Sequence, residues 1–289
     1  MDFSEKDSVD AVVASFADTP DPRLREVTES LVRHLHGFLR DVRPTIAEWE
    51  KGIEFLTAIG QKCDEHRQEF ILFSDVMGAS MLVETMEAAR QAQDATASTV
   101  LGPFHVVTSP ERELGDSIDT LGTGEACLIE GTVTGADGVP IPGARIDIWQ
   151  ADEQGAYDVE SDRQPLGNGR GLFTADDEGR YRFRSIVPSH YPIPTDGPVG
   201  DLLTATRRHP YRPAHVHFIV EAPGYVPVTT HVFVDGSPYL DSDAVFAVKQ
   251  SLVREFATVA DEAEAARHGL PNPFRRARFD VVLQPEGPA

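Results

Sequence analysis

Residues 211–220 read YRPAHVHFIV, a run of aromatic and β-branched residues that is typical of a β-strand. Within it, His215 and His217 lie two positions apart, and side chains two apart on a strand point to the same face of the sheet. The two imidazoles therefore project together. Such a pair can bind one metal ion, or it can be two packed and hydrogen-bonded histidines. The strand alone leaves both interpretations open.

The composition is that of a folded protein, with 289 residues of which 40% are hydrophobic and 25% charged. The net charge is −21 and the pI about 4.8, which disfavours nucleic acid and anionic membrane surfaces as partners. The first residues are acidic and lack the apolar run of a signal peptide, and no apolar stretch reaches the roughly 18 residues of a membrane span. Cys63 and Cys127 lack metal-type spacing, so we expect reduced thiols and a cytoplasmic location.

The first hundred residues carry helical patterns. Asp21 and Pro22 are a favourable helix start, and Pro44 predicts where that helix ends. Thr45 and Glu48 then form a capping-box signature for a second helix. Apolar residues recur at three- and four-residue steps along both: Leu24, Val27, Leu31, Leu35 and Phe38 in the first, and Ile46, Trp49, Ile53 and Leu56 in the second.

A third helix is predicted over residues 65–91, where Gly78 would allow another helix to approach closely. Three helices cannot bury all of these apolar stripes among themselves. They indicate packing on a second domain or on a second subunit, with core packing alone as the alternative, and we expect a homodimer through these helices.

From residue 99 onward, short apolar runs alternate with turn signals rich in Gly and Pro, as in ACLIEGTVTG followed by ADGVP. This spacing predicts a mostly antiparallel β-sandwich or barrel. We also expect a lone helix over residues 244–259 and a closing strand over 279–283. The predicted fold is therefore α+β, with a helical domain at residues 1–98 followed by an antiparallel β-sandwich domain at 99–289.

Two tyrosines bear on the histidine pair. Tyr157 follows a predicted strand in DIWQADEQGAYD, and Tyr191 lies in the Pro- and Gly-rich loop VPSHYPIPTDGPVG. Loops on a rigid strand scaffold commonly carry site residues. A trivalent cation would favour the phenolate form, and phenolate oxygens in turn favour Fe(III). Taken singly, each tyrosine can also be an ordinary packing residue.

Together, these segments resemble the intradiol ring-cleavage dioxygenases, the non-haem ferric enzymes that open catechol-type rings. The resemblance covers most of residues 100–250 and rests on LGPFHV, GVPIPGARIDIWQADEQGAYD, FRSIVPSHYPIPTDGPVG, RPAHVHF and TTHVFVDGSPYLDSDAVFAVK. The N-terminal helices look like the linker and dimerisation domain of the catechol and hydroxyquinol branches. The family also implies a phospholipid or similar lipid in a tunnel between these helices.

The resemblance implies four ligands of an Fe(3+) ion, with Tyr157 and His217 equatorial and Tyr191 and His215 axial. It implies catalytic roles for Tyr191, which is displaced by the substrate, and for Arg212, which lies beside the ring. The guanidinium of Arg212 could stabilise a developing negative charge in the substrate. A structural ion pair with an acidic residue is the alternative for Arg212.

Within the family, LGPFHV and SPYLDSDAVFAVK look most like the branch that acts on hydroxyquinol (benzene-1,2,4-triol). Asp75 could accept a hydrogen bond from the third hydroxyl, or it could be a polar residue on an exposed helix face. His231 occupies the position where the catechol branch usually has a glutamine near the ring. The substrate pocket implied by the branch consists of Leu72, Asp75, Val100, Leu101, Gly102, Pro103, Phe104, Ile193, Pro194, Arg212, His231 and Val245.

The implied activity is cleavage of hydroxyquinol by O₂ between the two adjacent hydroxyl carbons, giving 3-hydroxy-cis,cis-muconate (maleylacetate). Catechol or chlorocatechol 1,2-dioxygenase activity is the alternative within the enzymes. Non-enzymatic binding modules of the transthyretin-like kind also carry the pattern GTVTGADGVPIPGARIDIW. Such a module would need no metal ligands.

Overall fold

The computed structural model describes residues 3–64, 67–90, 94–105, 108–160 and 162–287. The chain divides into two compact units, Met1–Ala58 and Ile59–Ala289, and the division falls within a helix. The predicted division into residues 1–98 and 99–289 stays a prediction. No helix in the described part of the chain is both long enough and apolar enough to cross a membrane. Cys63 and Cys127 are both free thiols.

The first unit contains α1 (Ser8–Ala14), α2 (Pro22–Val42) and most of α3 (Ile46–Lys62). The carboxylate of Asp21 caps α2 by accepting the backbone N–H groups of Arg23 at 2.8 Å and Leu24 at 3.2 Å. The predicted capping box of α3 is also present. The backbone N–H of Thr45 donates to Glu48 Oε2 at 2.8 Å, and that of Glu48 donates to Thr45 Oγ1 at 3.3 Å.

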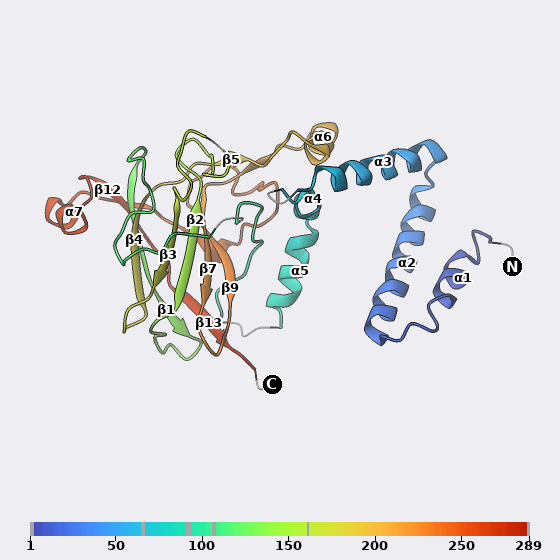
Figure 1. Cartoon of the computed structure of the whole chain (residues 1–289), viewed down its shortest axis with the longest axis horizontal. Helices are drawn as coiled ribbons and strands as arrows, with labels where there is room; N and C mark the ends of the chain where they lie inside the picture. The colour runs from blue at the N-terminus through green and yellow to red at the C-terminus, as the bar shows by residue number, and fades with distance from the viewer. Residues whose placement is uncertain (1–2, 65–66, 91–93, 106–107, 161, 288–289) are drawn as a thin grey trace. The chain divides into compact units, whose positions relative to one another are not determined.

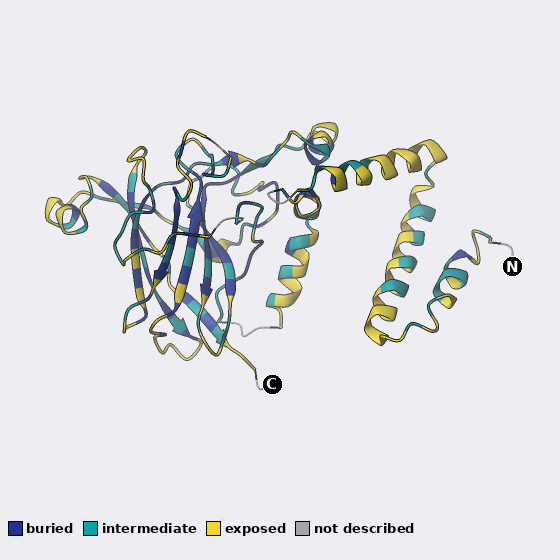
Figure 2. Cartoon of the chain, viewed as in Figure 1, coloured by how far each residue is buried: buried dark blue, intermediate teal, exposed yellow. Residues whose placement is uncertain are grey.

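The apolar stripes of α2 and α3 are not buried within the chain, and Figure 2 shows exposed residues along both helices. Their members are between 43% and 73% exposed: Leu24, Val27, Leu31, Leu35, Phe38, Ile46, Trp49, Ile53 and Leu56. Packing within the first unit therefore does not account for these stripes.

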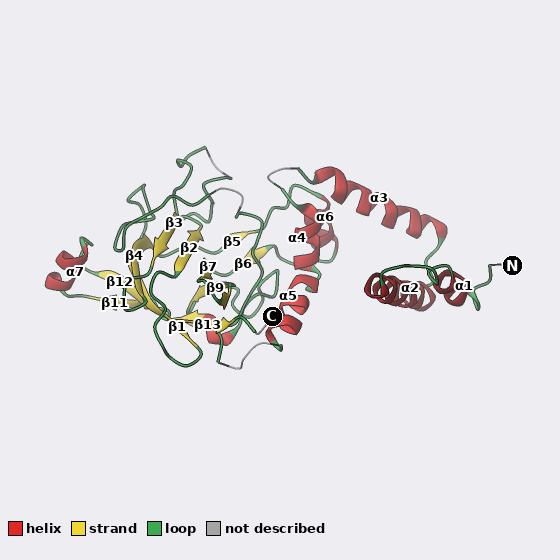
Figure 3. Cartoon of the chain, turned by 60° about the horizontal axis from the view of Figure 1, so that its bottom comes forward, coloured by secondary structure: helices red, strands yellow, loops and turns green. Residues whose placement is uncertain are grey.

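The second unit is a β-sandwich with flanking helices (Figures 1 and 3). One sheet has the order β11-β12-β1-β13-β8, with β4 also paired to β1, and the other has the order β10-β9-β7-β2-β3. The first sheet comprises β1 (Ala126–Gly135), β4 (Arg180–Ile186), β8 (Tyr225–Val226), β11 (Ala257–Val259), β12 (Phe274–Arg278) and β13 (Val281–Pro285). The second comprises β2 (Arg145–Gln150), β3 (Arg170–Thr174), β7 (His215–Glu221), β9 (Val228–Val234) and β10 (Val253–Arg254).

Most strand pairings are antiparallel, as predicted; β1 runs parallel to β12 and β13, and β9 runs parallel to β10. A short antiparallel pair joins β5 (Tyr191–Pro192) to β6 (Tyr211–Arg212). The remaining helical elements are α4 (Glu69–Val76), α5 (Ala79–Ala88), α6 (Pro198–Ala205), the 3₁₀ turn η1 (Gln250–Leu252) and α7 (Glu262–His268). The predicted closing strand is present as β13.

The core lies between the two sheets. Phe218 of β7 contacts Tyr181 and Phe183 of β4 edge-on or tilted, at ring-centroid distances of 6.1 and 6.2 Å. Since side chains alternate along a strand, His215 and His217 must lie on the other face of β7 from Phe218. The sandwich core thus anchors the strand, and its opposite face carries the histidine pair.

The predicted helix over residues 244–259 is wrong. This segment is a loop followed by η1, β10 and β11. The carboxylate of Asp243 accepts the backbone N–H groups of Val245 at 3.3 Å and Ala247 at 3.0 Å, and such bonds compete with helix formation. Strand pairing with β9 and β12 holds the rest of the segment, so tertiary contacts override its helical pattern.

The third predicted helix is interrupted. It forms two shorter helices, α4 and α5, and its expected ends at residues 65–66 and 91 lie outside the described residues. Gly78 separates the two with a left-handed backbone, φ 73°, a conformation that glycine adopts without a steric penalty. Gly78 therefore turns the chain between α4 and α5, and the predicted close approach of another helix stays a prediction.

Candidate metal centre

The register of the second sheet brings three rings to one face. His217 of β7 lies directly opposite Trp149 of β2 on one side and His231 of β9 on the other. The indole of Trp149 stacks on His217 with ring centroids 4.5 Å apart, and the ring of His231 lies 4.2 Å from His217. The imidazole of His217 is therefore held between two neighbouring strands.

The structure brings Tyr157, Tyr191, His215 and His217 together, and all four are buried. The Nε2 atoms of the two histidines lie 3.1 Å apart, and the Tyr157 hydroxyl lies 3.0 Å from His217 Nε2. The two tyrosine hydroxyl oxygens are 3.4 Å apart. Two nitrogens and two oxygens thus converge from β7, from β5 and from the loop after β2.

The protonation states of this set suit a metal ion. His215 donates its Nδ1–H to the carbonyl of Pro213 at 2.7 Å, so that its Nε2 presents a lone pair. Burial, followed by the nearby Arg212, lowers the pKa of His215 well below its usual value, and burial and the neighbouring histidines do the same for His217. Both rings are therefore neutral, as metal ligands must be, and a cation among the four atoms would satisfy the facing lone pairs.

Burial also raises the pKa values of Tyr157 and Tyr191, so both hydroxyls remain protonated unless a cation compensates the phenolate charge. Two phenol oxygens and two neutral imidazoles are a donor set that fits a hard, highly charged cation. The residues present thus fit a metal site of the kind that the sequence predicts.

His231 extends this cluster. Its ligand atom and those of His215 and His217 all lie within 4.8 Å of one another. The Nδ1 of His231 is hydrogen-bonded to the hydroxyl of Thr99, and its buried Nε2 has no partner among the described residues. The unpartnered Nε2 of His231 belongs to the same buried group of polar atoms, while the role of His231 toward a substrate stays a prediction.

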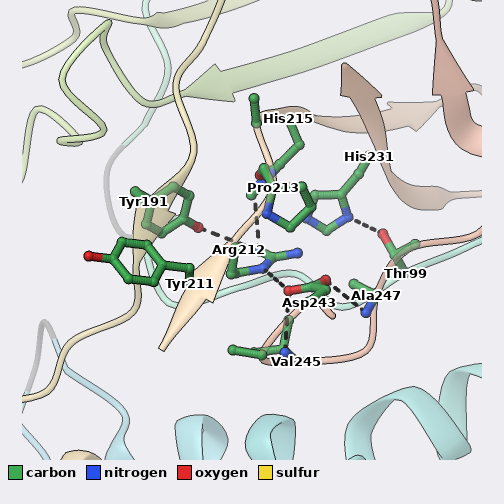
Figure 4. Close-up of polar contacts among 12 residues, drawn as sticks. Thr99, Tyr191, Tyr211, Arg212, Pro213, His215, His231, Asp243, Val245 and Ala247 are labelled. Carbon is green, nitrogen blue, oxygen red and sulfur yellow. Dashed lines mark hydrogen bonds and ion pairs between the residues drawn. The ribbon is translucent and has the colours of Figure 1, made fainter. Parts of the chain in front are cut away.

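Arg212 lies beside the candidate ligands Tyr191 and His215 (Figure 4). Its Nη1 is 3.2 Å from His215 Nε2 and 3.5 Å from the Tyr191 hydroxyl, and its Nε donates to Asp243 Oδ1 at 3.2 Å. Burial alone would lower the pKa of Arg212, but the facing carboxylate of Asp243 more than offsets this, so the pKa is raised. Arg212 is thus a buried cation that both adjoins the candidate ligands and forms an ion pair with an acid.

Two residues of the segment after Thr99 contact the candidate ligands. The ring of Phe104 stacks on Tyr157, with centroids 4.4 Å apart, and meets Tyr191 edge-on at 6.2 Å. Gly102 lies so close to His217 that a Cβ atom at position 102 would be 3.2 Å from the Cε1 of that imidazole. This segment therefore forms one wall of the site.

Asp75 is 2% exposed, so it is not a polar residue on an exposed helix face. Its pKa is raised, chiefly by burial, while a hydrogen bond with Ser80 and the charge of Arg212 act in the opposite direction. One carboxylate oxygen, Oδ1, has no hydrogen-bond partner in the described part of the chain. Such an acceptor is costly to bury unless a ligand supplies a donor.

The other predicted pocket residues differ in burial. Leu101 is exposed, Pro103 and Pro194 are half-buried, and the remainder are buried: Leu72, Val100, Ile193 and Val245. Their roles toward a substrate stay predictions.

Sequence reasoning missed three residues next to the site: Thr99, Trp149 and Asp243. The period-2 pattern of DIWQ could have placed Trp149 on the histidine face, since it is the counterpart of His217 across the ladder. Asp243 lies in the quoted motif SPYLDSDAVFAVK, but its contact with Arg212 depends on a loop that the helical pattern obscured.

Known proteins resemble this chain in both fold and sequence. A family model described as Dioxygenase matches residues 102–285, and one described as Catechol dioxygenase N terminus matches residues 21–95. A hydroxyquinol 1,2-dioxygenase of Nocardioides simplex is 50% identical over 283 residues, 97% of this chain and 96% of that protein. The crystal structure of hydroxyquinol 1,2-dioxygenase from Pseudomonas putida DLL-E4 has a TM-score of 0.89 at 44% identity, covering 98% of this chain and 99% of that one.

A more distant structure, the catechol 1,2-dioxygenase of Acinetobacter radioresistens, has a TM-score of 0.86 at 31% identity and covers 98% of this chain and 94% of that one. The chain therefore belongs to the intradiol ring-cleavage dioxygenases, and the predicted resemblance, α+β fold and enzyme class are confirmed. Within that family it is most like the hydroxyquinol 1,2-dioxygenases.

Proposed function

We propose that this enzyme uses Fe(III) and O₂ to open hydroxyquinol between its two adjacent hydroxyl carbons, giving 3-hydroxy-cis,cis-muconate (maleylacetate). The observation that carries the proposal is the convergence of Tyr157, Tyr191, His215 and His217 in a buried site, where each donor atom lies within 3.4 Å of at least one other. A transthyretin-like binding module would have no use for this costly group of buried polar atoms.

In this proposal, Tyr157, Tyr191, His215 and His217 hold the iron. When bound, Fe(III) would favour the phenolate forms of the tyrosines, hold the diol oxygens of the substrate and make the ring reactive toward O₂. His231 is assigned to the substrate side of the cluster, since its Nδ1 is taken by Thr99 and its buried Nε2 has no partner among the described residues.

In the proposed reaction, Tyr191 takes up a proton and Arg212 stabilises negative charge. With iron bound, Tyr191 would be a phenolate, and its oxygen would accept a proton from a substrate hydroxyl to become a neutral phenol as the diol binds. Arg212 Nη1, 3.5 Å from that oxygen, stabilises the negative charge that the departing proton leaves on the substrate. Phe104, stacked on Tyr157, helps to exclude water from the ring.

Asp75 distinguishes hydroxyquinol from the alternative substrates. Its unpartnered Oδ1 would accept the hydrogen bond of the third hydroxyl, whereas catechol offers no such donor and a chlorocatechol offers only a chlorine. A site that buries an unpaired acceptor discriminates against analogues that lack the donor.

Purified enzyme loaded with iron tests this assignment. We expect kcat/KM for hydroxyquinol to exceed that for catechol and 4-chlorocatechol by on the order of 10²-fold or more. Equal values for hydroxyquinol and catechol would reject the hydroxyquinol assignment. The loaded protein should also be visibly reddish through phenolate-to-iron charge transfer, and a folded protein that takes up no iron would reject the metal site.

We further propose that two copies of the chain associate through the apolar stripes of α2 and α3, and that a phospholipid occupies part of the same apolar surface. The support is the apolar stripe that includes Leu31 and Leu35, which packing within the first unit leaves exposed. Leu31→Glu should shift the mass measured by light scattering from a dimer to a monomer, whereas Arg33→Glu on the same helix should not. A monomeric wild-type protein would reject the dimer, and lipid extraction followed by mass spectrometry tests the lipid.

A further inference from the structure

The carboxylate of Asp243 forms hydrogen bonds both to the loop that follows it and to the guanidinium of Arg212 beside the site. Asp243 accepts the Nε–H of Arg212 at 3.2 Å and the backbone N–H of Val245 at 3.3 Å through Oδ1, and the N–H of Ala247 at 3.0 Å through Oδ2 (Figure 4). The side chains of Asp243 and Arg212 are each 2% exposed. The contact is therefore a buried ion pair and not a surface contact.

The loop that carries Asp243 is held independently of Arg212. Arg208 donates to the carbonyl of Val76 at 2.6 Å and to that of Ala244 at 3.0 Å, which ties the end of α4 to the loop. Phe246 has a left-handed backbone, φ 60°, which is uncommon for an aromatic residue, and its ring lies 5.2 Å from the Arg208 guanidinium. Asp243 is thus presented from a rigid support.

The ion pair determines which donors of Arg212 remain for other contacts. Because Nε is taken by Asp243, Nη1 faces His215 and Tyr191, and Nη2 has no partner among the described residues. A guanidinium is planar, so fixing one N–H direction fixes the others. A buried ion pair is by itself weak evidence for a contribution to stability, because its desolvation offsets its attraction.

We propose that Asp243 is a positioning residue for ring opening: it orients the Arg212 guanidinium so that Nη1 stays beside the Tyr191 oxygen and Nη2 faces the substrate. This inference rests on the proposed function. It adds to that function the residue that orients Arg212. The hydrogen bonds of the Asp243 carboxylate within the described part of the chain go to Arg212, Val245 and Ala247.

A double-mutant cycle tests the proposal in the iron-loaded enzyme. D243N should lower kcat for hydroxyquinol by about 10- to 100-fold, with a smaller change in KM, because a misdirected guanidinium stabilises the reacting state poorly. In an R212M background the same substitution should change kcat by less than about 3-fold, since no guanidinium remains to be oriented. The visible phenolate-to-iron band should persist in both variants.

R208M is the matched control. It releases the same loop from α4 without touching Arg212, so its effect on kcat should be the same in the wild-type and R212M backgrounds. If D243N also has equal effects in both backgrounds, Asp243 acts only by holding the loop, and the proposal is overturned.

Further measurements distinguish failure of this inference from failure of the proposed function. In a crystal structure of D243N, Nη1 of Arg212 should no longer lie beside the Tyr191 hydroxyl; an unchanged guanidinium overturns the proposal even if the enzyme has another substrate. If D243N does not fold, D243E keeps the charge but moves it, and full kcat in D243E overturns the proposal. A wild-type enzyme inactive on hydroxyquinol but coloured by iron instead rejects the hydroxyquinol assignment.

Discussion

The indole of Trp149 lies almost parallel to the imidazole of His217, with ring centroids 4.5 Å apart and an interplanar angle of 11°. His231 contacts the same imidazole at 4.2 Å. The ring of His217 is therefore held by its neighbours on both adjacent strands, before any metal ion binds.

Replacing Trp149 with leucine should weaken iron binding. The imidazole of His217 would lose its stacking partner, and changes that misorient a metal ligand commonly reduce metal affinity about 10- to 100-fold. Iron content per chain after dialysis against a chelator measures the effect. Trp49→Leu is the matched control, because Trp49 is the other tryptophan of the chain and is exposed on α3. Equal iron retention in both variants would show that the stacking is unimportant.

Gly102→Ala should reduce activity more than stability. Gly102 has φ 78°, and an added Cβ would lie 3.2 Å from the Cε1 of His217, so the imidazole or the pocket segment must move. Gly138→Ala is the control, since Gly138 has φ 77° with open space around the added atom. Both variants should lose about 1 kcal/mol of unfolding free energy from backbone strain. Only Gly102→Ala should alter kcat and the visible band; identical spectra would contradict the contact.

Asp75→Leu should change substrate preference. Loss of the carboxylate should lower kcat/KM for hydroxyquinol by on the order of 10²-fold, because the third hydroxyl would be buried without an acceptor. Turnover of catechol should stay the same or rise. Steady-state kinetics with both substrates in one preparation measure the preference, and a parallel loss on both would assign Asp75 a purely structural role.

The raised pKa of Asp75 predicts a pH dependence of KM. The ionised carboxylate accepts the hydrogen bond of the third hydroxyl more strongly than the protonated acid does, so KM for hydroxyquinol should rise as the pH falls through the raised pKa of Asp75. The KM for catechol should not follow this change, nor should the KM for hydroxyquinol in Asp75→Leu. Matching pH profiles for the two substrates in the wild type would exclude Asp75 from the contact.

The raised pKa of Asp75 also affects stability: substrate binding should improve as the pH rises, whereas the free energy of unfolding should fall. Between the usual value of 3.8 and the raised pKa, the folded state binds more protons at Asp75 than the unfolded state does. The contribution of Asp75 to unfolding free energy therefore falls as the pH rises through this range. Chemical denaturation of the wild type and Asp75→Leu across this range measures the difference, and parallel curves would contradict the raised pKa.

The features that sequence could predict are those determined locally. The cap at Asp21 and the capping box at Thr45 depend on residues within one turn, and both are present. The shared face of His215 and His217 follows from the period of a strand. The loop positions of Tyr157 and Tyr191 single them out, and the family resemblance implies that they are ligands; they lie far from the histidines in sequence but adjoin them in the fold.

The features that sequence could not predict depend on tertiary contacts. Residues 244–259 have a helical pattern, but side-chain hydrogen bonds from Asp243 and pairing of β10 and β11 prevent the helix. Likewise, the pattern could not decide whether Asp75 is exposed or buried, because that depends on what covers α4. For Arg212 the sequence leaves open a catalytic role and a structural ion pair. In the structure its guanidinium forms the ion pair with Asp243 and also lies beside the Tyr191 hydroxyl. The predicted cytoplasmic location stays a prediction.

The most direct test of the central claim is mass spectrometry of the product formed from hydroxyquinol under ¹⁸O₂ by the iron-loaded enzyme. We predict 3-hydroxy-cis,cis-muconate, or its keto form maleylacetate, carrying both labelled oxygen atoms, one in each new carboxylate. Unchanged hydroxyquinol, or a ring opened outside the two adjacent hydroxyl carbons, would contradict the account.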